Sequence, residues 1–193
     1  MVKPRVFDVE TALQTATWLF WRQGYEGTSL SDLTSAIGIT PPSFYNAFGS
    51  KEELFRKVLD NYTRTRLGFA EEALDCPTAH QVAKQLLTRL AELFTDPSRP
   101  PGCLAFNCSL AGGSPEGAFQ AELMKARKAR KERLRKRFAR AQQEGDLSPD
   151  ANPGALARFF LTVGWGMASD ARGGASRADL LHTVDLALKA FPE

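Results

Sequence analysis

Apolar residues recur at helical spacing along almost the whole chain, and this pattern restricts the possible folds more than any other feature. In residues 9–23 they stand at Ala12, Leu13, Ala16, Leu19 and Phe20, three to four positions apart as on one face of a helix. No segment shows the apolar–polar alternation that is typical of a half-buried strand. The sequence therefore predicts an all-α fold of about nine helices. They cover residues 9–23, 30–37, 41–46, 51–62, 78–94, 103–110, 116–144, 153–169 and 176–190.

Two short helices joined by a tight turn are predicted within residues 28–51. Ser29, followed three residues later by an acid, forms a capping-box pattern, and Gly38 then breaks the chain. Thr40 can cap the next helix, with Pro41 at the first helical position, where a missing N–H costs nothing. Helices this short are marginal alone, so they must pack on the preceding helix. The pattern predicts a helix-turn-helix.

A helix-turn-helix places its second helix in the major groove of DNA, with the first residues of that helix near base edges. Hydroxyl and amide groups can bond to bases or phosphates, proline can contact a thymine methyl, and a lysine at a helix start can hold a phosphate. The candidate DNA contacts are Thr28, Ser29, Thr40, Pro41, Pro42, Ser43, Tyr45, Asn46 and Lys51. The alternative is that these residues only build a small helical subdomain.

Residues 8–55 resemble the DNA-binding domain of the TetR family of transcriptional regulators. The matching stretches are GYEGTSLSDL (24–33), IGIT (37–40), SFYNAF (43–48) and SKEELF (50–55). The resemblance implies that Tyr45 and Lys51 occupy phosphate-contacting positions. Ala47 departs from the family, where many members have a polar residue, and this implies weaker affinity for each half-site.

The resemblance also implies the division of the chain and its function. Residues 1–51 would form the DNA-binding domain, and residues 52–193 a larger helical domain for ligand binding and dimerisation. We expect a homodimeric repressor that binds a palindromic operator on double-stranded DNA and is released by a small apolar or amphipathic effector. The stretches GCLAFNCSL (102–110) and 166–188 resemble one broad branch of the family.

Aromatic and apolar side chains after residue 52 are candidates for lining the effector cavity. They are Tyr62, Leu67, Phe69, Leu90, Phe94, Phe106, Phe119, Leu123, Trp165 and Met167, with Arg127 beside them. For each one the alternative is plain core packing.

Positive charge is concentrated in residues 125–140, which hold ten basic residues and one acid, for a net charge of +9. The remaining 15 basic and 21 acidic residues give −6, while residues 1–51 balance at zero. Arg127 and Arg130 lie near the apolar face of this predicted helix, and a buried arginine needs a partner. We expect an acid from a neighbouring helix to supply it, with an anionic ligand as the alternative. The other bases indicate a solvated face, or else a contact with DNA, a membrane or an acidic protein.

Three cysteines are too few for a disulfide framework. Cys103 and Cys108 are candidates for a thiol-based redox or electrophile sensor, and this is the alternative regulatory hypothesis. With only two histidines, no convincing metal site or catalytic set stands out. We therefore predict a protein that is not an enzyme and needs no cofactor.

The last two predicted helices each carry an apolar stripe that is a candidate dimer interface. The stripe residues are Leu156, Phe159, Phe160, Val163, Leu180, Val184 and Leu188. The alternative is that both stripes belong to the core of one protomer.

The sequence also bears on where the protein is found. It has no run of about 18 apolar residues that could span a membrane. No apolar stretch follows Lys3 and Arg5 as in a secretory signal. We expect a cytoplasmic protein with no membrane contact.

Overall fold

The computed structural model describes residues 8–110 and 118–191, with the side chains of 109–110 and 118–121 left aside. These residues form ten α-helices and one 3₁₀ helix, and no strand. The prediction of an all-α fold is confirmed, with one short α-helix and one 3₁₀ helix more than the sequence indicated. The elements are α1 Val9–Gln23, α2 Leu30–Ile37, α3 Pro41–Phe48, α4 Lys51–Arg66, α5 Phe69–Glu72, η1 Ala73–Asp75, α6 Ala79–Phe94, α7 Leu104–Leu110, α8 Ala118–Gln143, α9 Pro153–Arg172 and α10 Arg177–Leu188.

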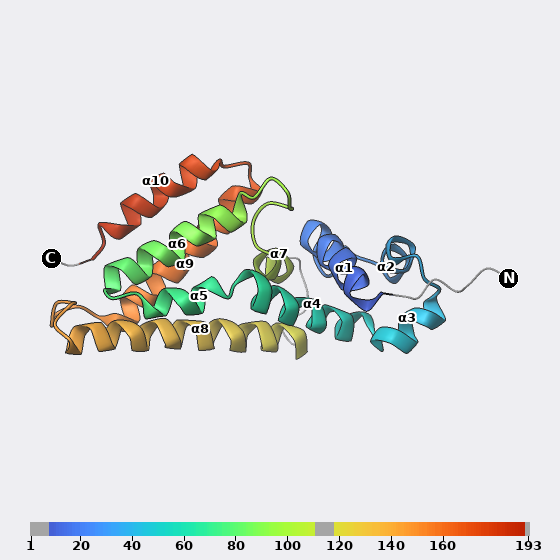
Figure 1. Ribbon diagram of the computed structural model, residues 1–193, viewed down its shortest axis with the longest axis horizontal. Helices are drawn as coiled ribbons and strands as arrows, with labels where there is room; N and C mark the ends of the chain where they lie inside the picture. Colours follow the sequence, from blue (N-terminus) through green and yellow to red (C-terminus); the bar gives the residue numbers. More distant parts are fainter. Residues whose placement is uncertain (1–7, 111–117, 192–193) are drawn as a thin grey trace.

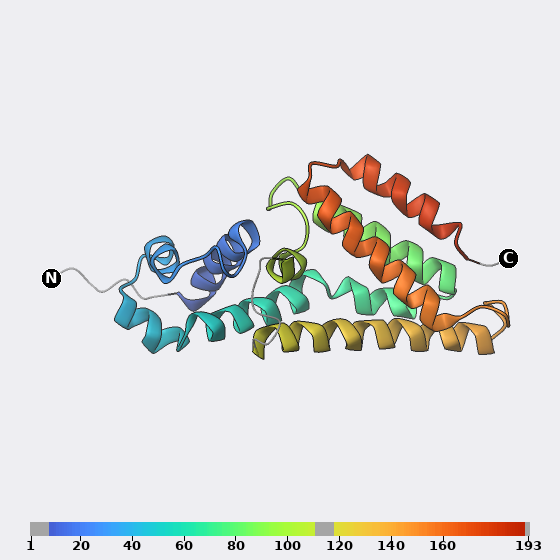
Figure 2. The same cartoon turned by 180° about the vertical axis from the view of Figure 1, so that it is seen from behind.

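The molecule is elongated, with two groups of helices joined along α4 (Figure 1). Helices α1, α2 and α3 gather at the N-terminal end, while α5, α6, α8, α9 and α10 form the larger group. Figure 2 shows α9 from behind, lying across α6 with α8 beneath it. Helix α7 lies between the two groups and packs on α1, α4, α8 and α9.

Short polar side chains fix the ends of the helices in the N-terminal group. Asp8 caps α1, and Ser29 forms a full capping box with Asp32 at the start of α2, as predicted. Ser50 caps α4, since the Glu53 N–H donates to its hydroxyl at 3.1 Å. Left-handed Gly38, at φ +78°, ends α2 and allows the tight turn into α3.

Aromatic side chains hold the N-terminal group together. Phe20 of α1 and Phe55 of α4 are fully buried and meet edge to face, with ring centres 4.7 Å apart. Phe44 and Phe48 of α3 are buried beside Leu33 of α2 in the same core. Helices α2 and α3 each have only eight residues, so this burial is what stabilises them. The core therefore fixes which face of α3 is left outside.

Helix α4 runs without a break from the N-terminal group into the larger one. It buries Leu54 and Phe55 against α1 near its start and Tyr62 near its end. The predicted division between residues 51 and 52 falls at the first residue of this helix, and it stays a prediction.

One glycine ties the loop between α6 and α7 to α9. Gly102 has φ +81°, and its N–H donates to the carbonyl oxygen of Phe94 at 2.9 Å. A Cβ at this position would lie 2.7 Å from the carbonyl oxygen of Ala168, well inside contact distance.

We expect Gly102→Ala to lower the free energy of unfolding by about 2–4 kcal/mol, because it combines a left-handed backbone with a clash. The matched control is Gly145→Ala, since Gly145 has φ +80° but open space around it. This control carries only the backbone cost of about 1 kcal/mol. Urea unfolding of both variants measures the difference, and equal losses would contradict the close approach to α9.

The buried arginine of α8 is Arg137, which is 5% exposed, whereas Arg127 and Arg130 are half-buried. The expectation that one of those two is buried against an acid is therefore corrected. Arg137 bonds to backbone instead, because its Nε donates to the carbonyl oxygen of Leu74 at 2.9 Å and its Nη2 to those of Cys76 and Pro77 at 2.7 and 3.0 Å. Its buried Nη1 has no partner among the described residues.

The other bases of residues 125–140 are only partly paired. Three of them form ion pairs with described acids, namely Arg133 with Glu71, Arg135 with Glu132 and Arg140 with Glu144. The four lysines of the segment form none within the described part of the chain. In the same part of the chain, no helix is both long enough and apolar enough to cross a membrane.

Candidate nucleic-acid interface and effector cavity

The outer face of α3 presents a compact set of polar and apolar side chains. Tyr45 is 52% exposed, and Asn46 lies exposed next to it. Thr40 caps the helix, with its hydroxyl 3.0 Å from that of Ser43. The two prolines that follow Thr40 are also exposed. The structure thus brings six of the nine candidate DNA contacts onto one short exposed helix start.

The candidates before α2 lie differently. Thr28 is fully buried, and its hydroxyl donates to the carbonyl oxygen of Gly24 at 2.8 Å. Ser29 is exposed, but its hydroxyl donates to Asp32 at 2.6 Å. We therefore remove Thr28 from the proposed DNA contacts, since it holds the α1–α2 turn, and keep Ser29 as part of the α2 N-terminus.

Lys51, at the first turn of α4, is half-buried against an aromatic ring. Its Nζ lies 4.3 Å from the centre of the Tyr25 ring, a cation–π contact. Burial lowers the pKa of Lys51, while the nearby Glu26 carboxylate acts in the opposite direction. This contact holds the Lys51 ammonium close to the surface of the N-terminal group of helices.

A cavity of about 220 Å³ lies between α4, α7, α8 and α9. Its apolar wall includes Leu59, Phe106, Leu123 and Trp165. Its other lining residues are Arg56, Asp60, Thr63, Cys103, Ala105, Glu122, Ala126, Arg127 and Arg130. The cavity is therefore amphipathic rather than purely apolar.

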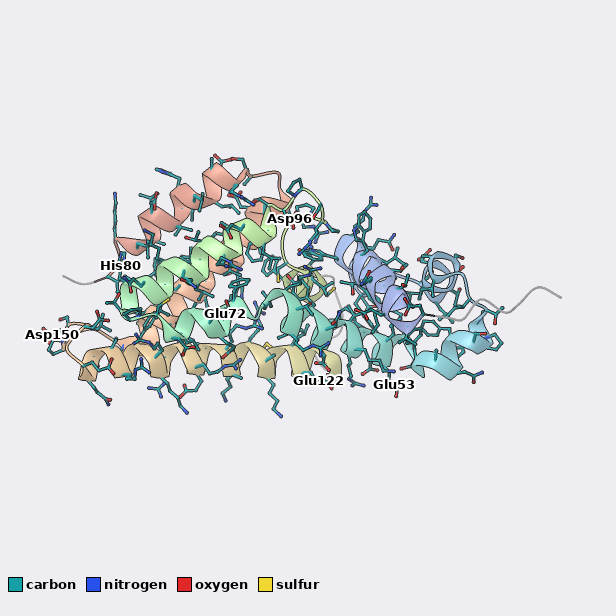
Figure 3. All side chains as sticks on the ribbon, in the orientation of Figure 1. Glu53, Glu72, His80, Asp96, Glu122 and Asp150 are labelled. Atoms are coloured by element: carbon teal, nitrogen blue, oxygen red, sulfur yellow. The ribbon has the colours of Figure 1, made fainter. Side chains whose placement is uncertain are left out.

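The charged groups of this cavity are unevenly paired. Arg56 donates to both carboxylate oxygens of Glu122, at 3.0 and 3.1 Å, and also reaches Glu52 at 2.7 Å. The hydrogen bond to Glu122 raises the pKa of Arg56. Figure 3 shows Glu122 at the end of α8 that lies beside α4. Arg127 instead lies over the Trp165 ring, with its guanidinium carbon 3.9 Å from the ring centre.

Comparisons with known proteins agree with this arrangement. Residues 12–58 match the model of the bacterial regulatory proteins of the tetR family, and residues 83–184 match the tetracyclin repressor-like C-terminal domain. The chain belongs to the TetR family. It is therefore a transcriptional regulator rather than an enzyme.

Several relatives and solved structures match this chain over nearly its whole length. The transcriptional repressor ComR of Escherichia coli K12 is 35% identical over 99% of this chain and 92% of its own length. A cysteine mutant of the regulator CifR, solved with 26-bp double-strand operator DNA, is 39% identical and has a TM-score of 0.91. It covers 98% of this chain and 100% of its own. A regulator from Rhodococcus sp. RHA1 is 43% identical with a TM-score of 0.66, covering 96% and 100%.

The cavity between α4, α7, α8 and α9 is lined by only some of the side chains that the sequence predicted. Phe106, Leu123, Arg127 and Trp165 line it. Five other predicted side chains do not line the cavity, because they pack in or against the hydrophobic core. They are Tyr62, Phe69, Leu90, Phe94 and Met167. Leu67 is likewise a core residue. The side chain of Phe119 lies outside the described residues.

The sequence predicted Tyr62 as the residue of α4 that lines the cavity and missed the four residues of this helix that do so. Arg56, Leu59, Asp60 and Thr63 line it, and they recur at the three- and four-residue steps of one helix face. This spacing was the available signal, but three of the four residues are charged or polar, whereas the cavity was predicted from aromatic and apolar side chains.

The two buried cysteines differ in their surroundings. Burial raises the pKa of Cys108 to about 12, and its thiol donates to the carbonyl oxygen of Phe20 at 3.5 Å. Cys108 is therefore almost wholly a thiol at neutral pH, which makes it a poor sensor. Cys103 lines the cavity, is 9% exposed and accepts a 3.5 Å hydrogen bond from the Tyr62 hydroxyl. Both cysteines are buried, whereas a reactive cysteine is normally exposed, so the structure does not favour thiol sensing.

The apolar stripes of the last two helices are mostly inside the protomer. Phe160, Leu180, Val184 and Leu188 are buried and belong to its core, where α10 packs on α6 and α9. Leu156 and Val163 are half-buried. Phe159 is 39% exposed on α9, and Leu186, which the sequence reading left out, is 53% exposed on α10.

Proposed function

We propose that this TetR-family transcriptional repressor binds a palindromic operator as a homodimer and releases it when a small amphipathic effector fills the cavity. The exposed start of α3 carries the DNA-binding part of this proposal. A relative with 39% identity and a TM-score of 0.91 was solved with double-strand operator DNA, which supports the assignment of this end of the chain to DNA.

The proposed dimer face is the outer side of α9 and α10. Phe159 and Leu186 are large apolar side chains exposed on these helices. Gly166, on the same helix as Phe159, has open space beside its backbone, so a helix of a second protomer can approach closely there. The buried residues of both stripes support this face from beneath rather than forming it.

Two elements link the cavity to the DNA-binding end. Helix α4 carries Arg56 in the cavity and Lys51 at its start, so a tilt of α4 moves both. On α7, the Asn107 amide donates to the carbonyl oxygen of Trp21 at 3.2 Å, which attaches the cavity wall to the end of α1. Successive half-sites lie about 34–36 Å apart. A shift of a few Å in the two copies of α3 is therefore sufficient to weaken binding.

We expect Tyr45→Ala to weaken operator binding by about 10- to 100-fold, because each of two protomers loses one phosphate contact. Tyr45 is exposed, so thermal unfolding should stay unchanged. The operator is the palindrome selected from random DNA by the wild-type protein, and fluorescence anisotropy measures its affinity.

The matched control for Tyr45→Ala changes charge on α8. Lys136 is exposed on that helix, and Lys136→Glu should leave specific operator binding within about threefold. If Tyr45→Ala leaves binding intact while Lys136→Glu abolishes it, the helix-turn-helix is not the operator-reading element.

A further inference from the structure

We infer that the cavity takes a small organic carboxylate, whose anionic group lies between Arg127 and Arg130 and whose apolar body lies against Trp165, Phe106 and Leu123. This inference rests on the proposed function only in identifying the cavity as the effector site. The binding itself is a separate claim, which needs no DNA to be tested.

The balance of charge in the cavity favours an anion. Five charged residues line it: Arg56, Arg127, Arg130, Asp60 and Glu122. Arg56 is held by Glu122 and by Glu52 outside the cavity, so it and Glu122 neutralise each other. Asp60 is exposed and can stay solvated. Arg127 and Arg130 are left, both half-buried and neither in an ion pair with any described carboxylate.

The two arginines are placed so that one ligand can reach both. They stand three residues apart on α8, so their side chains share one face of the helix. Both arginines line the same cavity as Cys103, whose sulfur accepts a hydrogen bond from the buried Tyr62 hydroxyl.

Stacking prepares Arg127 for a carboxylate. The guanidinium carbon lies 3.9 Å from the centre of the Trp165 ring, a cation–π contact that holds the group over the ring and uses none of its N–H groups. Two parallel N–H groups match the two oxygens of a carboxylate. The same Trp165 ring and the Phe106 and Leu123 side chains give an apolar body a surface to lie on.

The other ligand classes fit less well. A neutral apolar molecule would cover two half-buried guanidinium groups without pairing them, which is costly. A cation would meet two unpaired arginines and one solvated carboxylate. The volume of about 220 Å³ is below the range of drug-sized pockets, so the body must be small.

Calorimetry of the full-length protein without DNA tests the inference with two matched series. Benzoate is compared with benzamide and benzylamine, and hexanoate with hexanamide and hexylamine. We expect at least one of the two anions to bind about 10- to 100-fold more tightly than its own amide and amine, since a paired carboxylate adds charge-assisted hydrogen bonds. If neither anion binds at millimolar concentrations, or if in both series the amide or the amine binds as tightly as the anion, the inference is overturned.

Variants then assign the preference to the two arginines. Arg127→Gln and Arg130→Gln should each weaken binding of the anion by about tenfold or more and leave binding of the amide unchanged. The control Lys125→Gln removes an exposed charge from the same helix outside the cavity, and it should have less than a threefold effect. If the three changes had equal effects, the anion would be attracted by the overall positive charge of α8 and not bound at a site formed by the two arginines.

Operator binding measured with the bound anion separates the two claims. If the anion binds as expected but leaves operator affinity unchanged, effector-driven release is wrong and the carboxylate site stands. If the operator is released by the amides and amines as readily as by the anions, the proposed function stands and the carboxylate site is wrong.

Discussion

We expect Arg137→Ala to lower the free energy of unfolding by about 3–5 kcal/mol, the largest effect on stability of any change considered for this chain. The guanidinium is 5% exposed and donates three hydrogen bonds to backbone carbonyls. These carbonyls lie around the end of η1, where the chain turns from Leu74 to Pro77. Alanine removes the guanidinium donor from all three and also leaves a cavity at a buried position.

A matched arginine on the same helix serves as the control. Arg133 is about half exposed and pairs with Glu71 at 2.8 Å, so Arg133→Ala should cost less than about 1 kcal/mol. Urea unfolding followed by circular dichroism, at one protein concentration, measures both. A loss of less than 1 kcal/mol for Arg137→Ala would contradict the role given to its carbonyl contacts.

The second large effect concerns assembly. We expect the double variant Phe159→Arg, Leu186→Arg to be monomeric and to lose about 10²- to 10⁴-fold in operator affinity. Both side chains are exposed and apolar on the proposed dimer face, so two charges from each protomer would meet there. A monomer reads only one half-site and loses the gain from binding two at once. Sedimentation velocity measures the mass, and fluorescence anisotropy measures operator affinity.

The control for the double variant is the same kind of replacement on another helix. Met124 is 64% exposed on α8, and Met124→Arg should leave both the mass and the operator affinity unchanged. If the double variant stays dimeric while remaining folded, the dimer face lies elsewhere on the molecule, and the assignment to α9 and α10 is wrong.

The N-terminal helices were predictable because their ends are fixed by residues nearby in the sequence. Asp8, Ser29 and Thr40 cap helices through contacts with residues two or three positions away. Gly38 stops α2 by its own backbone geometry. None of these interactions depends on a distant segment, so spacing alone located the exposed face of α3. The exception is Thr28, whose burial depends on how α1 packs beside it.

The cavity was predictable only in part. Aromatic and apolar residues at helical spacing are shared by core and ligand sites, and the sequence cannot say which side of a helix meets a neighbour. Phe94 and Met167 proved to be core, while Arg56 and Asp60 of α4 proved to line the cavity. The difference arises because α8 lies beside the polar side of α4 and leaves a space there.

The sequence by itself determined the helices, their caps and the helix-turn-helix, together with the concentration of charge in residues 125–140. Only the tertiary structure decided what that charge does. It buries Arg137 against carbonyls at and just after η1, places Arg127 over the Trp165 ring, and leaves Arg130 at the cavity without an ion pair to any described acid. The physical reason is that caps and turns are satisfied by neighbours in the chain, whereas a long side chain finds its partner among helices that only the fold brings together.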